Sequence, residues 1–168
     1  MGKEINRIRL NRLYSENNIF EEITFHDGVN IILGEKYDDR SVKGRKTNGV
    51  GKSMSIEFLD FCFLNDYEKS RIVKIPKEVF PVEENVILDL DIGQETVTIK
   101  RNRKQADKPI LIREGKTVSF DKIQDARDYL TGIIFSKLNG KKVPSFRNLF
   151  SILMRDERSE FTDIIKCH

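Results

Sequence analysis

The chain has 168 residues, of which 38% are hydrophobic and 34% are charged. That length fits one domain of roughly 150 residues with its own core. Because 30 Lys and Arg stand against 27 Asp and Glu, the net charge is only +3, which excludes an acidic disordered chain and a histone-like polycation.

The sequence also lacks the features expected of a membrane or secreted protein. No apolar run approaches the roughly 18 residues of a membrane span, and the first residues lack the apolar core of a signal peptide. The two cysteines, Cys62 and Cys167, lie far apart, so they form neither a disulfide framework nor a zinc-binding spacing. We therefore expect a cytoplasmic protein without a membrane segment, in which Cys62 is a small core residue.

The first part of the chain predicts strands interrupted by a turn. In residues 5–13 apolar side chains alternate with basic and polar ones, which indicates a strand with one solvent-facing side, and residues 23–25 continue the pattern. Residues 26–28, His-Asp-Gly, have the composition of a turn. Residues 29–33 form a nearly continuous β-branched run, which predicts a strand covered on both faces.

The rest of the chain predicts a buried helix, several antiparallel strands and two further helices. Residues 54–64 are apolar on most sides, which indicates a buried helix. The prolines that follow, Pro76 and Pro81, argue against a long helix after it. Alternation and helical spacing then predict strands at 86–92, 96–101, 110–112 and 117–120, a helix that begins after Asp121 as its N-cap, and an amphipathic helix from Phe146.

The strongest chemical signal is the motif Asn-Gly-Val-Gly-Lys-Ser at residues 48–53. Glycines let backbone N–H groups approach phosphate oxygens, a lysine reaches the terminal phosphates, and a Ser hydroxyl binds Mg²⁺. The helix that follows adds its positive N-terminal end. The sequence therefore predicts a site for ATP and Mg²⁺, in which Ser53 binds the metal and these residues bind the nucleotide: Asn48, Gly49, Val50, Gly51, Lys52, Ser53 and Met54.

The motif departs from the strict pattern at its first position. Counting back from Gly51 places Lys46 where the first glycine belongs. Gly34, at the end of the β-branched run, can take that role only if residues 35–47 are an insertion. The alternative is that Gly-Val-Gly-Lys-Ser is an ordinary surface turn. The expected strand before the motif and helix after it favour the phosphate-binding interpretation.

The order of strand, glycine loop and helix resembles a known family. Residues 25–34, Phe-His-Asp-Gly-Val-Asn-Ile-Ile-Leu-Gly, followed by the motif at 48–53, look like the N-terminal lobe of the ABC-type ATPase heads of the SMC, SbcC and RecN class. The YydD-like bacterial ATPases are more similar still, since their phosphate loop is similarly stretched and their next helix reads like Phe58–Cys62. The resemblance covers nearly the whole chain.

The resemblance implies two further site residues. In those families a helix leads into the Q-loop, whose Gln contacts Mg²⁺. Here the helix from Phe146 leads to Asp156 and Glu157 instead of a Gln, so Asp156 is the expected metal-binding substitute. Family members also place a basic residue of the first strand at the nucleotide, and Arg12 is the candidate for it.

The fold that the resemblance implies is an α/β P-loop NTPase fold, with a mixed central sheet and an antiparallel β-lobe. The expected organisation is a single N-terminal lobe over 1–168, with a P-loop core at 1–64, the β-lobe at about 80–120 and a helical part at 121–168. The chain contains no Leu-Ser-Gly-Gly-type signature loop and no convincing Walker B strand. We therefore expect ATP binding without efficient hydrolysis, and a partner that is a second lobe or head.

That partner is either the missing C-terminal half or a second copy joined through the nucleotide, and the resemblance implies a role in DNA maintenance or phage defence. Two alternatives remain open. The chain could be a self-contained P-loop kinase or GTPase with Asp89 or Asp91 at the metal. It could also be a nucleic-acid-binding module that uses residues 98–116, where seven basic residues meet two acidic ones. A solvated loop is the simpler interpretation of that segment, because aromatic residues are not interleaved with the charges.

Overall fold

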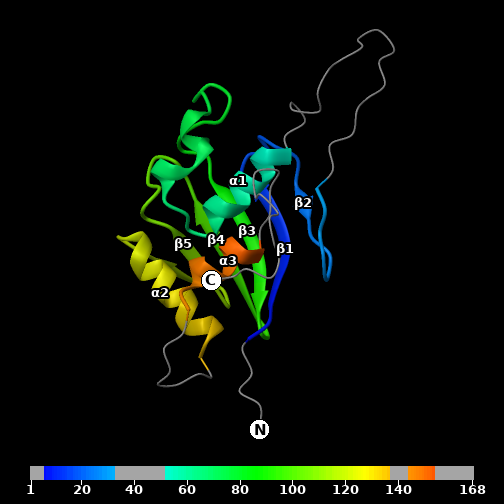
Figure 1. Cartoon of the computed structure of the whole chain (residues 1–168). Helices are drawn as coiled ribbons and strands as arrows, with labels where there is room; N and C mark the ends of the chain where they lie inside the picture. The colour runs from blue at the N-terminus through cyan, green and yellow to red at the C-terminus, as the bar shows by residue number, and fades with distance from the viewer. Residues whose placement is uncertain (1–5, 33–51, 137–143, 154–168) are drawn as a thin grey trace, which may run out of the picture.

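The structure is a computed structural model that describes residues 6–32, 52–136 and 144–153. In this part of the chain, the strands form one sheet in the spatial order β2-β1-β3-β4-β5-β6, and all neighbours are antiparallel (Figure 1). The strands are β1 (Ile8–Ser15), β2 (Ile23–Thr24), β3 (Val86–Ile92), β4 (Glu95–Arg101), β5 (Ile110–Arg113) and β6 (Lys116–Ser119). The helices are α1 (Lys52–Cys62), α2 (Ile123–Ile134) and α3 (Phe146–Leu153), with short 3-10 helices η1 (Tyr67–Lys69) and η2 (Arg71–Lys74).

One face of the sheet, which we call the covered face, carries the core. Every second residue of β3 and β4 points into it, and the side chains of Leu88, Leu90, Val97 and Ile99 are fully buried. The three α-helices lie over this face (Figure 1), and buried residues of each belong to the same core cluster. The burial of these large apolar side chains supplies the main favourable term in folding.

The predicted hairpin is confirmed, and so are the strands that follow it. The strands β3 and β4 pair along their whole length, from Val86 opposite Arg101 to Ile92 opposite Glu95. The tight turn between them places Gly93 at a φ of +67°, a left-handed conformation that glycine adopts without strain. Because side chains alternate across a strand, Asp89 and Asp91 lie on the opposite side of the sheet, which we call the open face.

The prediction of a strand at residues 29–33 is wrong for the residues that the structure describes. No strand is present at 29–32, and the side chains of Val29 and Ile31 are 88% and 74% exposed. The backbone instead closes into a loop, in which the side-chain oxygen of Asn30 accepts from the His26 N–H at 2.8 Å. A β-branched run forms a buried strand only where neighbouring elements cover it, and the described residues provide no such cover here.

The structure differs from the sequence prediction in two further details. The helix α2 begins after Lys122, which is its N-cap residue, and not after Asp121. The Asp121 carboxylate instead forms an exposed ion pair with Lys108 at 3.2 Å. In addition, β1 pairs with β3 over almost its whole length, so the first strand and the later strands belong to one antiparallel sheet. The described residues show that sheet and its helices, and the P-loop NTPase fold itself remains a prediction.

Candidate nucleotide-binding site

The helix α1 begins within the glycine motif, two residues before the start predicted from the sequence. Lys52 is its first residue, Ser53 is exposed, and Met54 packs partly against the core. No acidic residue occurs in the first turn. A helix N-terminus carries free N–H groups and partial positive charge, so this end of α1 has the electrostatics that a phosphate group requires.

Several of the expected site residues lie outside the described part of the chain. These are Asn48, Gly49, Val50, Gly51 and Asp156, together with the side chain of Lys52. Their roles therefore stay predictions from the motif and the resemblance. Ser53 and Met54 are described, and both lie in the first turn of α1.

Arg12 lies on the open face of the sheet, whereas α1 packs on the covered face. Its Nε donates to Asp89 Oδ2 at 2.6 Å, and its Nη1 lies 3.6 Å from Glu22 Oε2. The guanidinium also sits 4.5 Å from the centre of the Tyr14 ring. The hydrogen bond with Asp89 is the largest cause of the raised pKa of Arg12. The structure thus gives Arg12 partners within the sheet and does not bring it beside Ser53.

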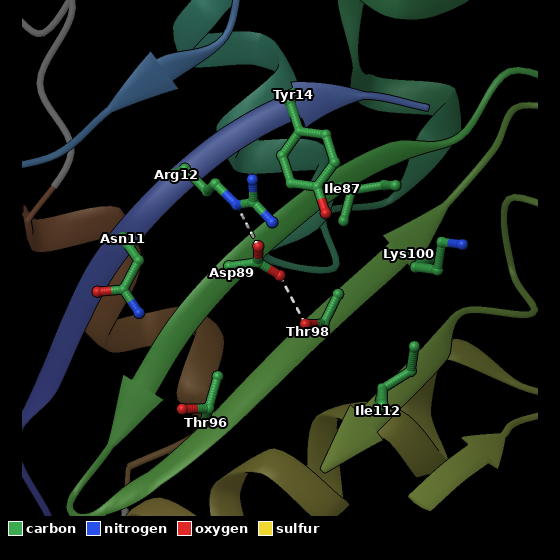
Figure 2. A pocket seen from close by; sticks show the side chains of 9 residues that line it. All are labelled: Asn11, Arg12, Tyr14, Ile87, Asp89, Thr96, Thr98, Lys100 and Ile112. Atoms are coloured by element: carbon green, nitrogen blue, oxygen red, sulfur yellow. Dashed lines mark hydrogen bonds and ion pairs between the residues drawn. The ribbon is translucent and has the colours of Figure 1, made fainter. Parts of the chain in front are cut away.

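A shallow hollow of about 400 Å³ occupies the open face around Arg12 (Figure 2). Asp89 lies at its centre, where it accepts from both Arg12 and the Thr98 hydroxyl, the latter at 2.6 Å. Asp91 accepts from the Thr96 hydroxyl at 3.0 Å. These contacts are those of a polar, half-exposed sheet surface, and within the described residues no group of three or more His, Cys, Asp or Glu side chains could hold a metal ion.

The opposite end of α1 is held by three arginines, Arg101, Arg127 and Arg147, which we call the arginine clamp. Arg101 comes from β4, and only 1% of it is exposed. Its Nη1 donates to the carbonyl oxygens of Phe61 and Asn65, each at 2.7 Å, and its Nε donates to Ala106 O at 2.6 Å. Its Nη2 is buried without a hydrogen-bond partner in the described structure. Burial is the main cause that lowers the pKa of Arg101 to about 10.

The other two members of the arginine clamp come from helices. Arg127, on α2, donates to Leu64 O at 2.6 and 3.0 Å and pairs with Asp66 at 2.7 Å. Arg147, on α3, donates to Asp60 Oδ1 at 2.6 Å and to Phe63 O at 3.2 Å. The last carbonyl groups of a helix lack intrahelical partners and carry partial negative charge. The arginine clamp satisfies several of these oxygens at the end of α1 and in the turn after it.

Sequence reasoning missed the arginine clamp because it counted Arg101 among the surface charges of residues 98–116. The alternation of β4 contains the missing signal, since Val97 and Ile99 point inward and Arg101 continues the same period. Several neighbouring charges of that segment form ion pairs within the chain, but much of the segment lies on β4 and β5, so the interpretation as a loop is wrong for those residues. These pairs are Lys100 with Glu16, Lys104 with Glu83, Lys108 with Asp121 and Arg113 with Glu95.

The prediction that Cys62 is a core residue is confirmed. It lies in the last turn of α1 with its side chain fully buried, and this burial raises the pKa of its thiol far above the ordinary value. A thiol that stays protonated is a poor nucleophile, and Cys62 packs in the core. Among the described residues, no helix combines the length and apolar character needed to cross a membrane.

Comparison with known proteins gives one informative relative. The chain is 29% identical over 156 residues to the uncharacterised protein YydD of Bacillus subtilis (strain 168), a match that covers 88% of this chain. It spans only about 25% of the length of that relative. No protein-family model and no solved structure matches the chain significantly. The comparisons thus support similarity to YydD and leave the wider ATPase class to be proposed.

Proposed function

We propose that this chain is the ATP-binding N-terminal lobe of an SMC- and SbcC-like ATPase. The observation that carries the proposal is the sequence Asn-Gly-Val-Gly-Lys-Ser at residues 48–53, whose last two residues begin α1. In this proposal backbone N–H groups of the motif and of the first turn hold the phosphates, Lys52 contacts the terminal phosphates, and Ser53 binds Mg²⁺. Met54 contributes its backbone at the same turn.

The packing of α1 supports this assignment. Phe58, Leu59 and Phe61 bury the middle and end of the helix against the sheet, while Ser53 stays exposed at its start. A helix held in this way can present its N-terminal N–H groups in a fixed direction, which favours binding by preorganisation. The first turn, with Ser53 exposed and no acidic residue, gives favourable charge for a triphosphate.

A second lobe is part of the proposal. Val29 and Ile31 are large apolar side chains left exposed just before the phosphate motif, and exposed apolar patches often mark interfaces. The chain also spans about a quarter of the length of its relative YydD. We infer that a further lobe covers this segment, either from the rest of a longer chain or from a second copy joined through the nucleotide. That lobe would supply the Walker B and signature groups, and Asp156 would assist at Mg²⁺.

The alternative functions have less support from the described contacts. A self-contained kinase or GTPase would need Asp89 or Asp91 at the metal, yet Asp89 pairs with Arg12 and Asp91 lies beside Thr96. A nucleic-acid module built on residues 98–116 would need available cations, and most of these are engaged in ion pairs or buried. A cytoplasmic location and a role in DNA maintenance or phage defence complete the proposal, and the latter rests on the resemblance.

Calorimetric titration of the chain with ATP and Mg²⁺ tests the proposal, followed by a phosphate-release assay on the same sample. We expect binding that Lys52→Ala removes, with little turnover. Lys69→Ala is the matched control, because Lys69 is an exposed lysine that pairs only locally with Asp66, and it should bind as the original chain does. Equal affinity of the original chain and Lys52→Ala would refute the proposed site. Efficient turnover would instead favour a self-contained enzyme.

A further inference from the structure

Two loops meet at a small aromatic cluster on α1. Phe20 follows β1, Phe58 lies on α1, and Phe80 follows η2. The rings of Phe20 and Phe58 stack with 4.6 Å between their centres, and the Phe80 ring lies 5.1 Å from Phe58 and 6.5 Å from Phe20. Phe58 and Phe80 are buried, whereas Phe20 is only partly buried. The residues that precede Phe20 and Phe80 are apolar and exposed, with 44% of Ile19 and 64% of Val79 accessible to solvent.

We call Ile19, Phe20 and Val79 the apolar patch. The loop that carries Ile19 is held by two buried polar side chains. Ser15 is fully buried, and its hydroxyl oxygen accepts from the N–H groups of Ile19 and Phe20 at 2.6 and 3.3 Å. The buried carboxylate of Glu84 accepts from the backbone and side-chain N–H groups of the same loop, at residue 17, each at 2.7 Å. A buried polar group is costly unless it is hydrogen-bonded, so these contacts favour one conformation of the loop.

The loop that carries Val79 is a short turn between two prolines. Pro76 and Pro81 restrict the backbone dihedral φ at its two ends. The Pro76 carbonyl accepts from the N–H groups of Val79 and Phe80 at 3.1 and 3.0 Å. The buried ring of Phe80 anchors this turn in the aromatic cluster. Both loops therefore present an apolar side chain on a backbone that is already fixed, which lowers the entropy cost of binding a partner.

The same two loops are strongly acidic. Residues 16–22 and 76–84 together contain six glutamates and one lysine. The glutamates are Glu16, Glu21, Glu22, Glu78, Glu83 and Glu84. Three of them form ion pairs with neighbouring cations. In the part of the chain that the structure describes, Glu21 and Glu78 form no ion pair, stay exposed, and each stand next to a patch residue in the sequence.

We propose that the apolar patch docks a segment of a partner protein in which apolar side chains are flanked by lysine or arginine. Exposed apolar side chains with a polar rim are typical of protein interaction sites. The apolar side chains of the segment pack on Ile19, Phe20 and Val79, and its cations lie beside Glu21 and Glu78. Charge complementarity selects a basic partner here and disfavours an acidic one. The inference goes beyond the proposed function, because it involves no nucleotide.

A peptide titration tests the proposal. A labelled amphipathic peptide of leucine and lysine is titrated with the 168-residue chain, and binding is followed by fluorescence anisotropy. A peptide in which glutamate replaces every lysine is the matched control. We expect the leucine–lysine peptide alone to bind, and Ile19→Ser and Val79→Ser each to weaken its binding by about fivefold or more. Val29→Ser should bind as the original chain does, because Val29 is 88% exposed and lies outside the apolar patch.

The charge of the rim is tested separately. The double substitution Glu21→Gln and Glu78→Gln should weaken binding of the leucine–lysine peptide and reduce its dependence on salt. If the two peptides bind equally well, or if neither binds, the proposal is overturned. It is also overturned if Ile19→Ser and Val79→Ser bind the peptide as tightly as the original chain does, since the peptide then contacts another surface.

Sedimentation velocity distinguishes a second copy of the chain from a basic partner. We expect the original chain to stay monomeric through this surface. A dimer that Ile19→Ser dissociates would assign the apolar patch to self-association and overturn the proposal. The outcome of the ATP titration is independent of these results, so a failure of the proposed function and a failure of this inference can be told apart.

Discussion

The two ends of α1 differ in how completely the described residues surround them. At the C-terminal end, the arginine clamp donates hydrogen bonds to carbonyl oxygens of the last turn and of the turn beyond it. The rings of Phe63 and Phe150 stack at the same place. At the N-terminal end, the side chain of Ser53 is exposed. Elsewhere in the described chain, Val29 and Ile31 also leave their apolar side chains in solvent. The described contacts thus anchor the C-terminal end of α1, and the N-terminal end is where we propose that phosphate binds.

Substitutions in the arginine clamp should lower the stability of the fold. Among its three members, we expect the largest loss for Arg101. Arg101→Ala removes the hydrogen bonds that Arg101 donates to the carbonyls of Phe61, Asn65 and Ala106, and it opens a cavity. We expect the free energy of unfolding to fall by about 3 kcal/mol or more, measured by chemical denaturation.

Lys100→Ala is the control for that substitution. Lys100 is the neighbouring residue of β4, lies on the open face and forms a partly exposed ion pair with Glu16. Its loss should cost at most about 1 kcal/mol. Equal effects of the two substitutions would contradict the view that Arg101 holds the end of α1.

Arg127 should have a smaller effect, because its side chain is partly exposed. Arg127→Ala removes two hydrogen bonds to Leu64 O and the pair with Asp66. Bonds that involve a charged group contribute more than neutral ones, so we expect a loss of about 2 kcal/mol. The control is Gln124→Ala on the exposed side of α2, whose change should stay within about 0.5 kcal/mol. If Arg127→Ala lowers the free energy of unfolding no more than Gln124→Ala does, then Arg127 does not stabilise the end of α1.

Acid should weaken the same end of α1 through Asp66. Hydrogen bonds from Lys69 and Arg127 lower the pKa of Asp66 from 3.8 to about 2. The pKa of Asp66 is lower in the folded state than in the unfolded state. Its charge therefore stabilises the fold fully above the unfolded-state pKa, and this stabilisation is lost as the pH falls through the folded-state pKa. With 42% of its side chain exposed, this contribution should stay below about 1 kcal/mol.

Denaturation curves of the original chain and Asp66→Asn, taken at about pH 5 and about pH 2, measure that contribution. The two proteins should differ in stability at the higher pH and approach each other at the lower one. A difference that does not shrink on acidification would mean that the charge of Asp66 is not what stabilises the turn.

The smallest change is expected for the exposed side chains of Val29 and Ile31. Val29→Ser and Ile31→Ser replace exposed side chains, so each should alter the stability of the isolated chain by no more than about 0.5 kcal/mol. Both should weaken association with the second lobe that we propose. A large loss of stability in the isolated chain would show that this segment is already packed, and it would remove the case for an interface there.

Local patterns predict most of the helices and strands in the described part of the chain, and long-range contacts account for the errors. The alternation of β3 and β4 and the glycine turn between them are local signals, and the hairpin was predicted at nearly its observed bounds. The run at 29–33 carries an equally strong local signal, but a buried strand also needs neighbours, which the sequence of that segment does not contain. Arg101 finds its oxygens about 36 and 40 residues away, so composition alone assigned it to the surface.

The site itself was predictable only in part. The glycine motif is a sequence signal, and the start of α1 at Lys52 agrees with it. The partner of Arg12 was not foreseeable, because Asp89 comes from a strand that pairs with β1 across 77 residues. The support of α1 by residues of β4, α2 and α3 depends on the whole topology, which no motif near residue 52 reveals.

The central claim is that the N-terminal end of α1 receives the phosphates of ATP. Hydrogen exchange of the backbone amides at residues 52–56, with and without saturating Mg-ATP, tests it most directly. Since the first N–H groups of a helix lack intrahelical partners, we expect bound phosphate to slow their exchange, and Ser53→Ala to weaken the effect that Mg²⁺ adds. ATP that binds while these amides exchange unchanged, with protection instead around Arg12 and Tyr14 on the open face, would contradict the claim.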